Sequence, residues 1–486
     1  MLLTERLTAA QQTLQPIGQD HALRFYNQLD DAQKHTLLSQ IESTDWPQVV
    51  RLIQTHVKHK PPLALPQKLQ PAPWYPYRPT AELEAKYRRA RQRGEELIRQ
   101  GKVAAFTVAG GQATRLGYDA PKGTFPATPI TRTPLFACLA QYIRKVQQKY
   151  NVVVPWYVMT SPDNDAPTRA FFAQHDYFGL DRLNVMLFTQ ATMPALDIRT
   201  GKVLLAAPGR LCLSPDGHGG SLKALYASGA IADMKRRGIE QISYTQVDNP
   251  HVRMVDPLFV GLHDLDAAQM SSKMLPKAYP RERLGNFCLV NGRVAVIEYS
   301  DLPDELADQR TADGELRFRA GSIAIHVIRV DFVEALNQRS GSQASSPKPQ
   351  AFFALPYHRA GKTVPYVDTK TGRHVEPSTA NAVKLETFVF DALPMCEKSI
   401  VYETDRIEEF APIKNAEGVD SPETSRQLQI ERAARWLESR GVTVPRNSDG
   451  RPEAVIEIQP LTAIEPADLD TTDLPGSIER GAKLLI

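Results

Sequence analysis

The chain has 486 residues, of which 42% are hydrophobic and 23% charged, and its formal net charge is +3. This composition is typical of a globular protein, and the small net charge excludes the strongly basic footprint of a nucleic-acid-binding protein. No apolar run approaches the roughly 20 residues that a membrane span needs, and the polar N-terminus does not resemble a signal peptide. We therefore expect a cytoplasmic protein with neither nucleic acid nor membrane as a partner. The 4 cysteines contain no Cys-x-x-Cys pair, which is typical of unpaired thiols.

Residues 1–101 are expected to form a helical N-terminal region that ends in a connector. Leucine and isoleucine recur at helical spacing within residues 1–57, and Asp45 before a Trp-Pro pair is typical of a helix N-cap. Residues 60–79 contain seven prolines, which favour an extended connector because proline neither continues a helix nor donates to a sheet. A charged helix is predicted over residues 81–100.

Residues 102–395 alternate between strand-like and helix-like segments, which predicts an α/β core. Residues 396–486 are expected to form a small C-terminal domain with one helix, and the Ser- and Gln-rich residues 338–350 predict an exposed loop. Strands are predicted over residues 103–108, 152–159, 185–188, 241–247, 269–275, 287–290, 294–299 and 323–330, and helices over residues 135–150, 168–175 and 220–237.

A glycine-rich loop follows the buried strand at residues 103–108. Gly110 and Gly111 end the strand, and the cations Arg115 and Lys122 follow them. Because glycines let backbone N–H groups approach a ligand closely, a loop with two cations suits a triphosphate. It contains neither G-x-x-x-x-G-K-[ST] nor G-x-G-x-x-G, which excludes a P-loop and the dinucleotide fingerprint. An ordinary turn with two solvated cations is the alternative.

Two further segments have the composition of ligand-binding loops. Residues 214–220 read S-P-D-G-H-G-G before a predicted helix, where free N–H groups can bind an oxygen-rich ligand. A helix-capping loop is the alternative. Asp248 follows the strand at residues 241–247, and one carboxylate is enough to hold Mg²⁺ when phosphates supply other ligands. A strand-terminating Asx turn is the alternative for Asp248.

The loop G-G-x-x-x-R-L-G-x-x-x-P-K-G resembles the signature of the UDP-N-acetylhexosamine and UDP-glucose pyrophosphorylase family, whose members use UTP. That family often has a third glycine where Ala113 stands, and a negative φ there would suit alanine. Further segments resemble the family in the same order, from about Val103 to Arg426. They are F-T-Q at 188–190, P-D-G-H-G-G at 215–220, V-D-N at 247–249, L-G-N at 284–286 with V-I-E-Y-S at 296–300, V-P-Y-V-D at 364–368 and E-E-F-A-P-I-K-N-A at 408–416.

The resemblance implies a Rossmann-like fold with a mixed, mostly parallel sheet and a UTP:sugar-1-phosphate uridylyltransferase activity. UTP, a sugar 1-phosphate and Mg²⁺ are the implied ligands, and no oligomeric state is indicated. No Ser, Cys or His nucleophile is required, because the sugar phosphate attacks UTP directly and cations stabilise the charge. The roles implied by the resemblance are nucleotide binding for Ala109, Gly110, Gly111, Gln190 and Gly217, catalysis for Arg115, Lys122 and Lys414, sugar binding for His218, Gly285, Glu298, Ser322 and Lys362, and metal binding for Asp248.

Each of these roles has a simpler alternative, since single lysines, glutamines and glutamates are usually solvated surface residues. Other protein classes also compete with the enzyme. A dehydrogenase is excluded by the missing fingerprint, and a kinase-like transferase would move a γ-phosphate without releasing pyrophosphate. A non-catalytic sugar-nucleotide binding protein would keep Gln190 but could lose Asp248 and Lys414, so the presence of both favours the enzyme.

The sequence gives opposing indications about the sugar. The overall match favours N-acetylglucosamine 1-phosphate. His218, however, replaces the family's asparagine as in the glucose branch, and Ser322 and Ile325 replace two asparagines of a G-N-I-A-N-H segment. Because isoleucine can neither donate to nor accept from a sugar, glucose 1-phosphate and broad acceptance are the alternatives.

Overall fold

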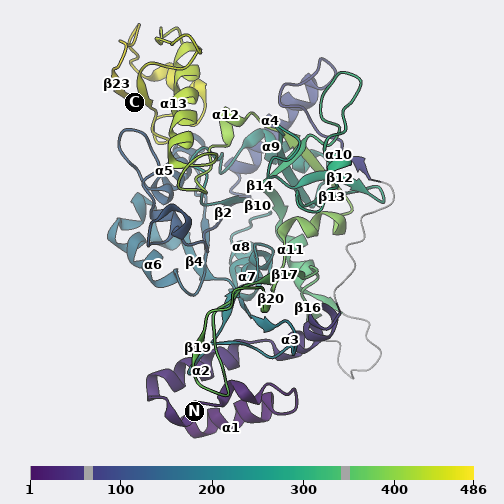
Figure 1. Ribbon diagram of the computed structural model, residues 1–486. Helices are drawn as coiled ribbons and strands as arrows, with labels where there is room; N and C mark the ends of the chain where they lie inside the picture. The colour runs from purple at the N-terminus through teal and green to yellow at the C-terminus, as the bar shows by residue number, and fades with distance from the viewer. Residues whose placement is uncertain (1, 60–68, 341–350) are drawn as a thin grey trace. The chain divides into compact units, whose positions relative to one another are not determined.

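The computed structural model describes residues 2–59, 69–340 and 351–486 (Figure 1). Part of the predicted connector, residues 60–68, and part of the predicted loop, residues 341–350, lie outside this description. The chain divides into two compact units, each built from separate stretches of sequence. The first comprises Met1–Leu65, Gln190–Ser221 and Leu355–Val389, and the second comprises Pro66–Thr189, Leu222–Ala354 and Phe390–Ile486. The three-part division based on sequence stays a prediction.

The first unit combines N-terminal helices with short strands. Asp45 caps α3, because its side chain accepts from the N–H of Gln48 at 3.1 Å, as the sequence predicted. Leu37, Leu38 and Val49 share one hydrophobic cluster with side chains from the strands of this unit. The helices are α1 (Leu3–Leu14), α2 (Asp31–Ser43) and α3 (Trp46–Leu52), and the strands are β5 (Thr192–Pro194), β6 (Leu196–Asp197), β7 (Leu205–Ala207), β8 (Arg210–Leu211), β9 (Leu213–Pro215), β17 (His358–Lys362), β18 (Tyr366–Val367), β19 (His374–Val375) and β20 (Ala382–Glu386).

A mixed ten-stranded sheet forms the centre of the second unit. Its parallel part runs in the order β10, β2, β3, β4, and β2 and β3 are buried, mainly apolar strands as the sequence predicted. β14 pairs antiparallel with both β10 and β11, which makes the sheet mixed. The strands are β1 (Gln70–Pro71), β2 (Val103–Val108), β3 (Trp156–Thr160), β4 (Val185–Thr189), β10 (Gln241–Gln246), β11 (Met270–Pro276), β12 (Asn286–Val290), β13 (Arg293–Ile297), β14 (Ala320–Arg329) and β21 (Ser399–Glu403).

Helices cover this sheet, and α12 and α13 lie in the C-terminal region (Figure 1). α4 and α9 cross so closely that a Cβ on Gly94 would lie 1.7 Å from the carbonyl oxygen of Pro257. The prediction of one helix over residues 220–237 is wrong, because Gly229 adopts a φ of 81° and ends one helix before the next begins. The helices are α4 (Glu84–Arg99), α5 (Leu135–Tyr150), α6 (Asp165–Gln174), α7 (Gly220–Ala227), α8 (Ala230–Arg236), α9 (Pro257–Leu265), α10 (Asp304–Ala307), α11 (Val330–Asn337), α12 (Arg406–Glu409) and α13 (Pro422–Glu438).

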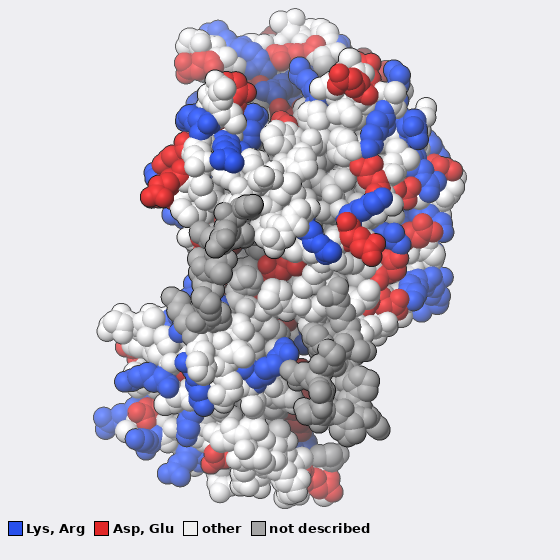
Figure 2. All heavy atoms as spheres, turned by 90° about the vertical axis from the view of Figure 1, so that its right-hand side faces the viewer, with Lys and Arg blue, Asp and Glu red and all other residues white. Residues whose placement is uncertain are grey.

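The remaining short strands are β15 (Arg339–Ser340), β16 (Ala351–Phe352), β22 (Val455–Glu457) and β23 (Lys483–Leu485). All four cysteines are buried and unpaired. Within residues 2–59, 69–340 and 351–486, no helix has the length and apolar character that a membrane crossing demands. On the face that Figure 2 draws, basic and acidic side chains are interspersed, in keeping with the small net charge.

Candidate functional site

The glycine-rich loop begins at the carboxyl end of β2. Among the residues that the structure describes, no atom would lie within 4 Å of a Cβ on Gly111, so this part of the loop has room for a ligand. The side chain of Asn164 holds the loop, because its Nδ2 donates to the carbonyl oxygens of Ala109 and Gly111 at 2.9 and 3.4 Å. Ala113 has a φ of −91°, so alanine fits without strain where the family often has glycine.

Lys122 returns to this loop and faces Asp248. Its backbone N–H donates to the carbonyl oxygen of Gly111 at 3.2 Å, and its Nζ lies 4.0 Å from Oδ2 of Asp248. Asp248 follows β10, which is the parallel neighbour of β2, so both residues lie at the carboxyl edge of the sheet. The next residue, Gly123, packs against the ring of Phe136 so closely that a Cβ would lie 2.1 Å from it, which fixes the backbone beside Lys122.

Lys414 belongs to a segment that is bonded to the backbone of Asp248. The N–H of Ile413, the preceding residue, donates to the carbonyl oxygen of Asp248 at 2.9 Å. The Nζ of Lys414 lies 3.4 Å from Oδ2 of Asp420, and both side chains are partly exposed.

Arg115 lies on an exposed single turn, Thr114–Leu116, and within the described residues it makes no ion pair. The structure thus brings together the glycine loop, Lys122, Asp248 and the Lys414 segment.

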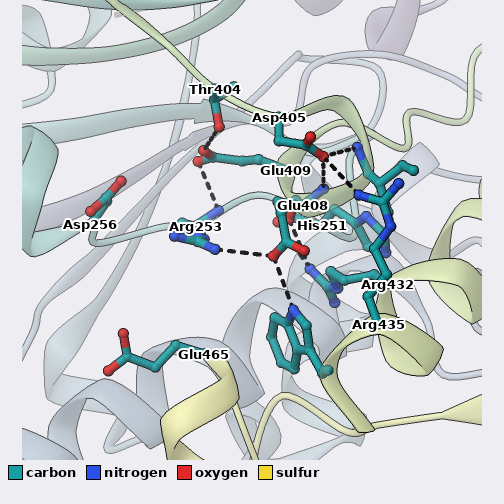
Figure 3. Close-up of polar contacts among 12 residues, drawn as sticks. His251, Arg253, Asp256, Thr404, Asp405, Glu408, Glu409, Arg432, Arg435 and Glu465 are labelled. Carbon is teal, nitrogen blue, oxygen red and sulfur yellow. Dashed lines mark hydrogen bonds and ion pairs between the residues drawn. The ribbon is translucent and has the colours of Figure 1, made fainter. Parts of the chain in front are cut away.

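A buried charge network anchors the segment that precedes Lys414, and Figure 3 draws its members Arg253, Asp256, Thr404 and Glu409. Nζ of the fully buried Lys273 donates to Oδ2 of Asp256 at 2.7 Å and to both carboxylate oxygens of Glu409 at 2.6 Å. Burial acts to raise the pKa of Asp256, but the charges of Lys273 and Arg253 outweigh it and lower that pKa to about 2. Because the charges are paired, this network can fix the backbone between Thr404 and Phe410.

Three of the residues predicted to bind the sugar lie close together: Gly285 just before β12, Glu298 just after β13 and Ser322 near the start of β14. The N–H of Ser322 donates to the carbonyl oxygen of Gly285 at 2.7 Å, and a Cβ on Gly285 would lie 3.5 Å from Oε1 of Glu298. A Cβ there would also lie 2.5 Å from Val296, so only glycine fits. Ile325 belongs instead to the hydrophobic core and is 3% exposed.

In the first unit, the loop after β9 is pressed against the chain after β20. The N–H of Gly219 donates to the carbonyl oxygen of Thr387 at 2.8 Å, and a Cβ on Gly217 would lie 2.3 Å from that same oxygen. Gly217 also has a φ of 86°, which L side chains rarely adopt. Gly217 and Gly219 of P-D-G-H-G-G are therefore required by backbone packing.

His218 and Gln190 present two different polar groups in this unit. Nδ1 of His218 accepts from the N–H of Val389 at 3.1 Å, which places the proton of the neutral ring on Nε2. Burial, with a smaller contribution from His358, lowers the pKa of His218 to about 4.

Gln190 is 6% exposed, and its Nε2 has no hydrogen-bond partner among the described residues. Lys362 is exposed on β17, and no bond within the described residues joins it to the other predicted site residues.

Sequence reasoning missed two asparagines that organise the second unit. Asn164 follows β3 and Asn249 follows Asp248, so both stand at the carboxyl edge of the sheet, which is the one signal that could have indicated them. Asn249 bonds the chain near Lys414, since its Nδ2 donates to the carbonyl oxygen of Glu409 at 2.7 Å and its Oδ1 accepts from the N–H of Ala411 at 3.0 Å.

The Asp248 carboxylate, at the carboxyl edge of the sheet, suits a hard cation that also binds phosphate oxygens. Among residues 2–59, 69–340 and 351–486, no group of three or more His, Cys, Asp or Glu side chains assembles to hold a metal. A single carboxylate such as Asp248 suits Mg²⁺, which takes most of its ligands from water and substrate phosphates. A glycine loop, a lysine and one aspartate at the carboxyl edge of parallel strands define a nucleotide-binding α/β enzyme.

The comparisons with known proteins agree with this class. Residues 65–421 match the family model described as UTP–glucose-1-phosphate uridylyltransferase. The chain is 36% identical over 482 residues to UDP-N-acetylhexosamine pyrophosphorylase-like protein 1 of Homo sapiens, covering 93% of this chain and 91% of that protein. It is 36% identical over 360 residues to UDP-N-acetylglucosamine pyrophosphorylase of Saccharomyces cerevisiae, covering 72% and 73%.

A solved structure supports the same assignment. The uridine diphosphate N-acetylglucosamine pyrophosphorylase of Trypanosoma brucei, solved in complex with an inhibitor, superposes with a TM-score of 0.80 at 25% identity, covering 100% of this chain and 98% of that one. The chain belongs to the UTP–glucose-1-phosphate uridylyltransferase family, and it is therefore a nucleotidyltransferase. The family, the α/β fold and the uridylyltransferase activity predicted from the sequence are confirmed.

Proposed function

We propose that the protein transfers the uridylyl group of UTP to N-acetylglucosamine 1-phosphate, with Mg²⁺ as cofactor and pyrophosphate as the second product. The proposal rests chiefly on the 4.0 Å approach of Lys122 and Asp248 beside an open glycine loop. A phosphate oxygen of the sugar phosphate forms a bond to the α-phosphorus of UTP, and the bond from that phosphorus to the bridging oxygen breaks as pyrophosphate leaves. Two polyanions must meet, so positive charge is the main requirement.

Each predicted residue has a role in this proposal. Lys122 and Arg115 offset the charge that grows on the leaving pyrophosphate, while Lys414 offsets the charge of the attacking phosphate. Asp248 would hold Mg²⁺, which supplies charge neutralisation of the phosphates when it is bound. The nucleotide-contacting residues are Ala109, Gly110, Gly111, Gln190 and Gly217, and the sugar-contacting residues are His218, Gly285, Glu298, Ser322 and Lys362.

The buried amide of Gln190 supports the uracil role. A buried donor without a partner is costly, and a uracil carbonyl would satisfy it. The closeness of Gly285, Glu298 and Ser322 supports a polyol-binding role for that cluster, because a carboxylate and a hydroxyl can both bond sugar hydroxyls. The names of the relatives in Homo sapiens and Saccharomyces cerevisiae favour an N-acetylhexosamine.

Glucose 1-phosphate is a second candidate substrate. His218 favours it, because the resemblance places a histidine at this position in the glucose branch and an asparagine in the N-acetylhexosamine branch. Broad acceptance of both sugars would follow if His218 can bond either of them.

The reaction itself is tested by product analysis. Incubation with UTP, MgCl₂ and N-acetylglucosamine 1-phosphate is expected to yield UDP-N-acetylglucosamine and pyrophosphate in equal amounts, and pyrophosphate with the UDP-sugar should regenerate UTP. A product that carries the γ-phosphate of UTP would overturn the proposal in favour of a kinase. No turnover with N-acetylglucosamine, N-acetylgalactosamine, glucose or galactose 1-phosphate would favour a non-catalytic binding protein.

A further inference from the structure

Helix α13 of the C-terminal region touches both segments that carry the proposed catalytic lysines. On one side, Arg426 Nη2 donates to the carbonyl oxygen of Pro126 at 2.9 Å, four positions after Lys122. On the other side, Ser425 Oγ donates to the carbonyl oxygen of Ala411 at 2.6 Å, three positions before Lys414. Both contacts arise from adjacent residues near the start of the helix, so α13 bridges the two segments directly.

Buried side chains of α13 connect the segment that follows Lys122 to the segment that precedes Lys414. Gln429 Nε2 donates to the carbonyl oxygen of Ala127 at 3.3 Å and lies 3.3 Å from Ser425 Oγ. An amide nitrogen carries two hydrogens and a hydroxyl both donates and accepts, so one continuous relay satisfies every group. Its order is Ala127 carbonyl, Gln429 amide, Ser425 hydroxyl and Ala411 carbonyl.

The relay continues to the neighbour of the proposed metal ligand. The N–H of Ala411 donates to Oδ1 of Asn249, which directly follows Asp248. Asn249, Ser425 and Gln429 are 5%, 1% and 9% exposed, so water does not compete strongly for these bonds. The relay therefore links the segments of Lys122, Lys414 and Asp248 within one unit.

We propose that Ser425 and Gln429 are positioning residues that set the separation of Lys122 from Lys414 for uridylyl transfer. The inference rests on the proposed function. Neither side chain reaches the reacting atoms; each fixes a carbonyl whose segment carries a catalytic cation. Phosphate transfer depends on accurately placed charge, and a displacement of about 1 Å can cost on the order of 10²-fold in rate. Breaking the relay lets the two lysines move apart while each keeps its charge.

The test compares Ser425→Ala, Gln429→Met and the double variant in the full chain. Each single variant is expected to lower kcat about tenfold in both directions, with KM for UTP changed less than twofold. The double variant should be no slower than the worse single variant, because either break interrupts the same relay. Ser425→Thr keeps the hydroxyl and should restore most of the turnover.

Gln427→Met is the matched control, since Gln427 is exposed on the same helix and bonds Glu423 of the preceding turn. It should leave kcat unchanged. A lowered urea midpoint with unchanged kcat in the Ser425 and Gln429 variants would reveal a purely structural role and overturn the inference. Independent losses that multiply in the double variant would overturn it too.

Failure of the inference can be told apart from failure of the proposed function. If Lys122→Ala and Lys414→Ala slow turnover while Gln429→Met does not, only the positioning role is wrong. If the two lysine variants turn over normally, the proposed catalytic roles are wrong and the positioning role falls with them.

Discussion

Nζ of Lys122 lies 4.0 Å from Oδ2 of Asp248, and the two side chains are 17% and 12% exposed. This separation is longer than a direct hydrogen bond, so the carboxylate and the ammonium group both retain capacity for a further ligand. Both side chains lie at the carboxyl edge of β2 and β10, where a metal ion bound to phosphate could lie between them. The Asp248 carboxylate would then face the metal ion, and the Lys122 ammonium group would face the phosphate.

Replacing Asp248 tests the metal role directly. Asp248→Asn keeps the size of the side chain, so the urea midpoint should change little, but turnover should fall by on the order of 10²-fold or more. The measurement is kcat as a function of MgCl₂ concentration, with wild type in chelator for comparison. Asp264→Asn is the control, because Asp264 pairs with Arg93 away from the glycine loop. Full activity of Asp248→Asn, or of wild type in chelator, would remove the metal from the mechanism.

The three proposed cations should act on the transition state. Lys122→Ala, Lys414→Ala and Arg115→Ala are each expected to cost about 2–4 kcal/mol in kcat/KM, in the forward and the reverse reaction. Steady-state kinetics in both directions measures this loss, and Lys398→Ala, which removes an exposed lysine before β21, serves as the control. A raised KM with unchanged kcat would assign that residue to ground-state binding, and normal values of both would exclude it from the site.

Gln190 should select the base of the nucleotide. Its buried Nε2 has no partner among the described residues, and a carboxylate in its place could only accept. We therefore expect Gln190→Glu to lower kcat/KM for UTP by on the order of 10²-fold, since a buried group would be left unpaired. The comparison of UTP with CTP in wild type and variant measures the effect. An unchanged preference would leave Gln190 without a role in recognition.

The parts of the fold that the sequence predicted are those set by local pattern. Helix α5 has the bounds expected from its apolar periodicity, and β2 and β3 are buried, mainly apolar runs. The break at Gly229 was missed because an isolated glycine is tolerated within many helices. The grouping of Gln190–Ser221 and Leu355–Val389 with the N-terminal helices depends on contacts between distant segments, which no local pattern carries.

The residues of the site likewise divide into those that a local sequence pattern indicates and those that depend on contacts between distant segments. The glycine loop, Lys122 and Asp248 could be singled out in the sequence by local composition together with the family resemblance, and the structure brings them together. Asn164, Asn249, Ser425 and Gln429 act through partners far along the chain, so in sequence they are ordinary polar residues. Ile325 was considered for sugar selection because of its place in a motif, but it packs into the core.

His218 should make stability depend on pH. Its folded-state pKa is lowered to about 4 by burial, against about 6.5 in an unfolded chain. Above pH 6.5 the ring is neutral in both states; between pH 6.5 and 4 only the unfolded chain takes up the proton. The free energy of unfolding therefore falls as the pH decreases through this window, by on the order of 1–3 kcal/mol.

The measurement is the urea midpoint of wild type and His218→Asn at pH 7.5 and pH 4.5. Other buried histidines, such as His263, also have lowered pKa values and contribute equally to both proteins. The wild type should lose more stability on acidification than the variant. Parallel losses in the two proteins would show that His218 does not remain neutral in the folded state.

Sugar choice is the last prediction, and it depends on His218 and Ser322. We expect kcat/KM with UTP to be highest for N-acetylglucosamine 1-phosphate among the 1-phosphates of N-acetylglucosamine, N-acetylgalactosamine, glucose and galactose. His218→Asn and Ser322→Asn should each raise the ratio of N-acetylglucosamine to glucose turnover, because an amide can both donate to and accept from an acetamido group. Lys362→Ala changes a predicted sugar contact that lies at an exposed position on β17, apart from His218 and Ser322, and the same ratio measures its effect.

A wild-type preference for glucose 1-phosphate of tenfold or more, equivalent to about 1.4 kcal/mol, would overturn the choice of substrate. In that case His218 is the residue that selects glucose, and His218→Asn should partly reverse the preference, whereas Ile325, which lies in the core, should have no part in it.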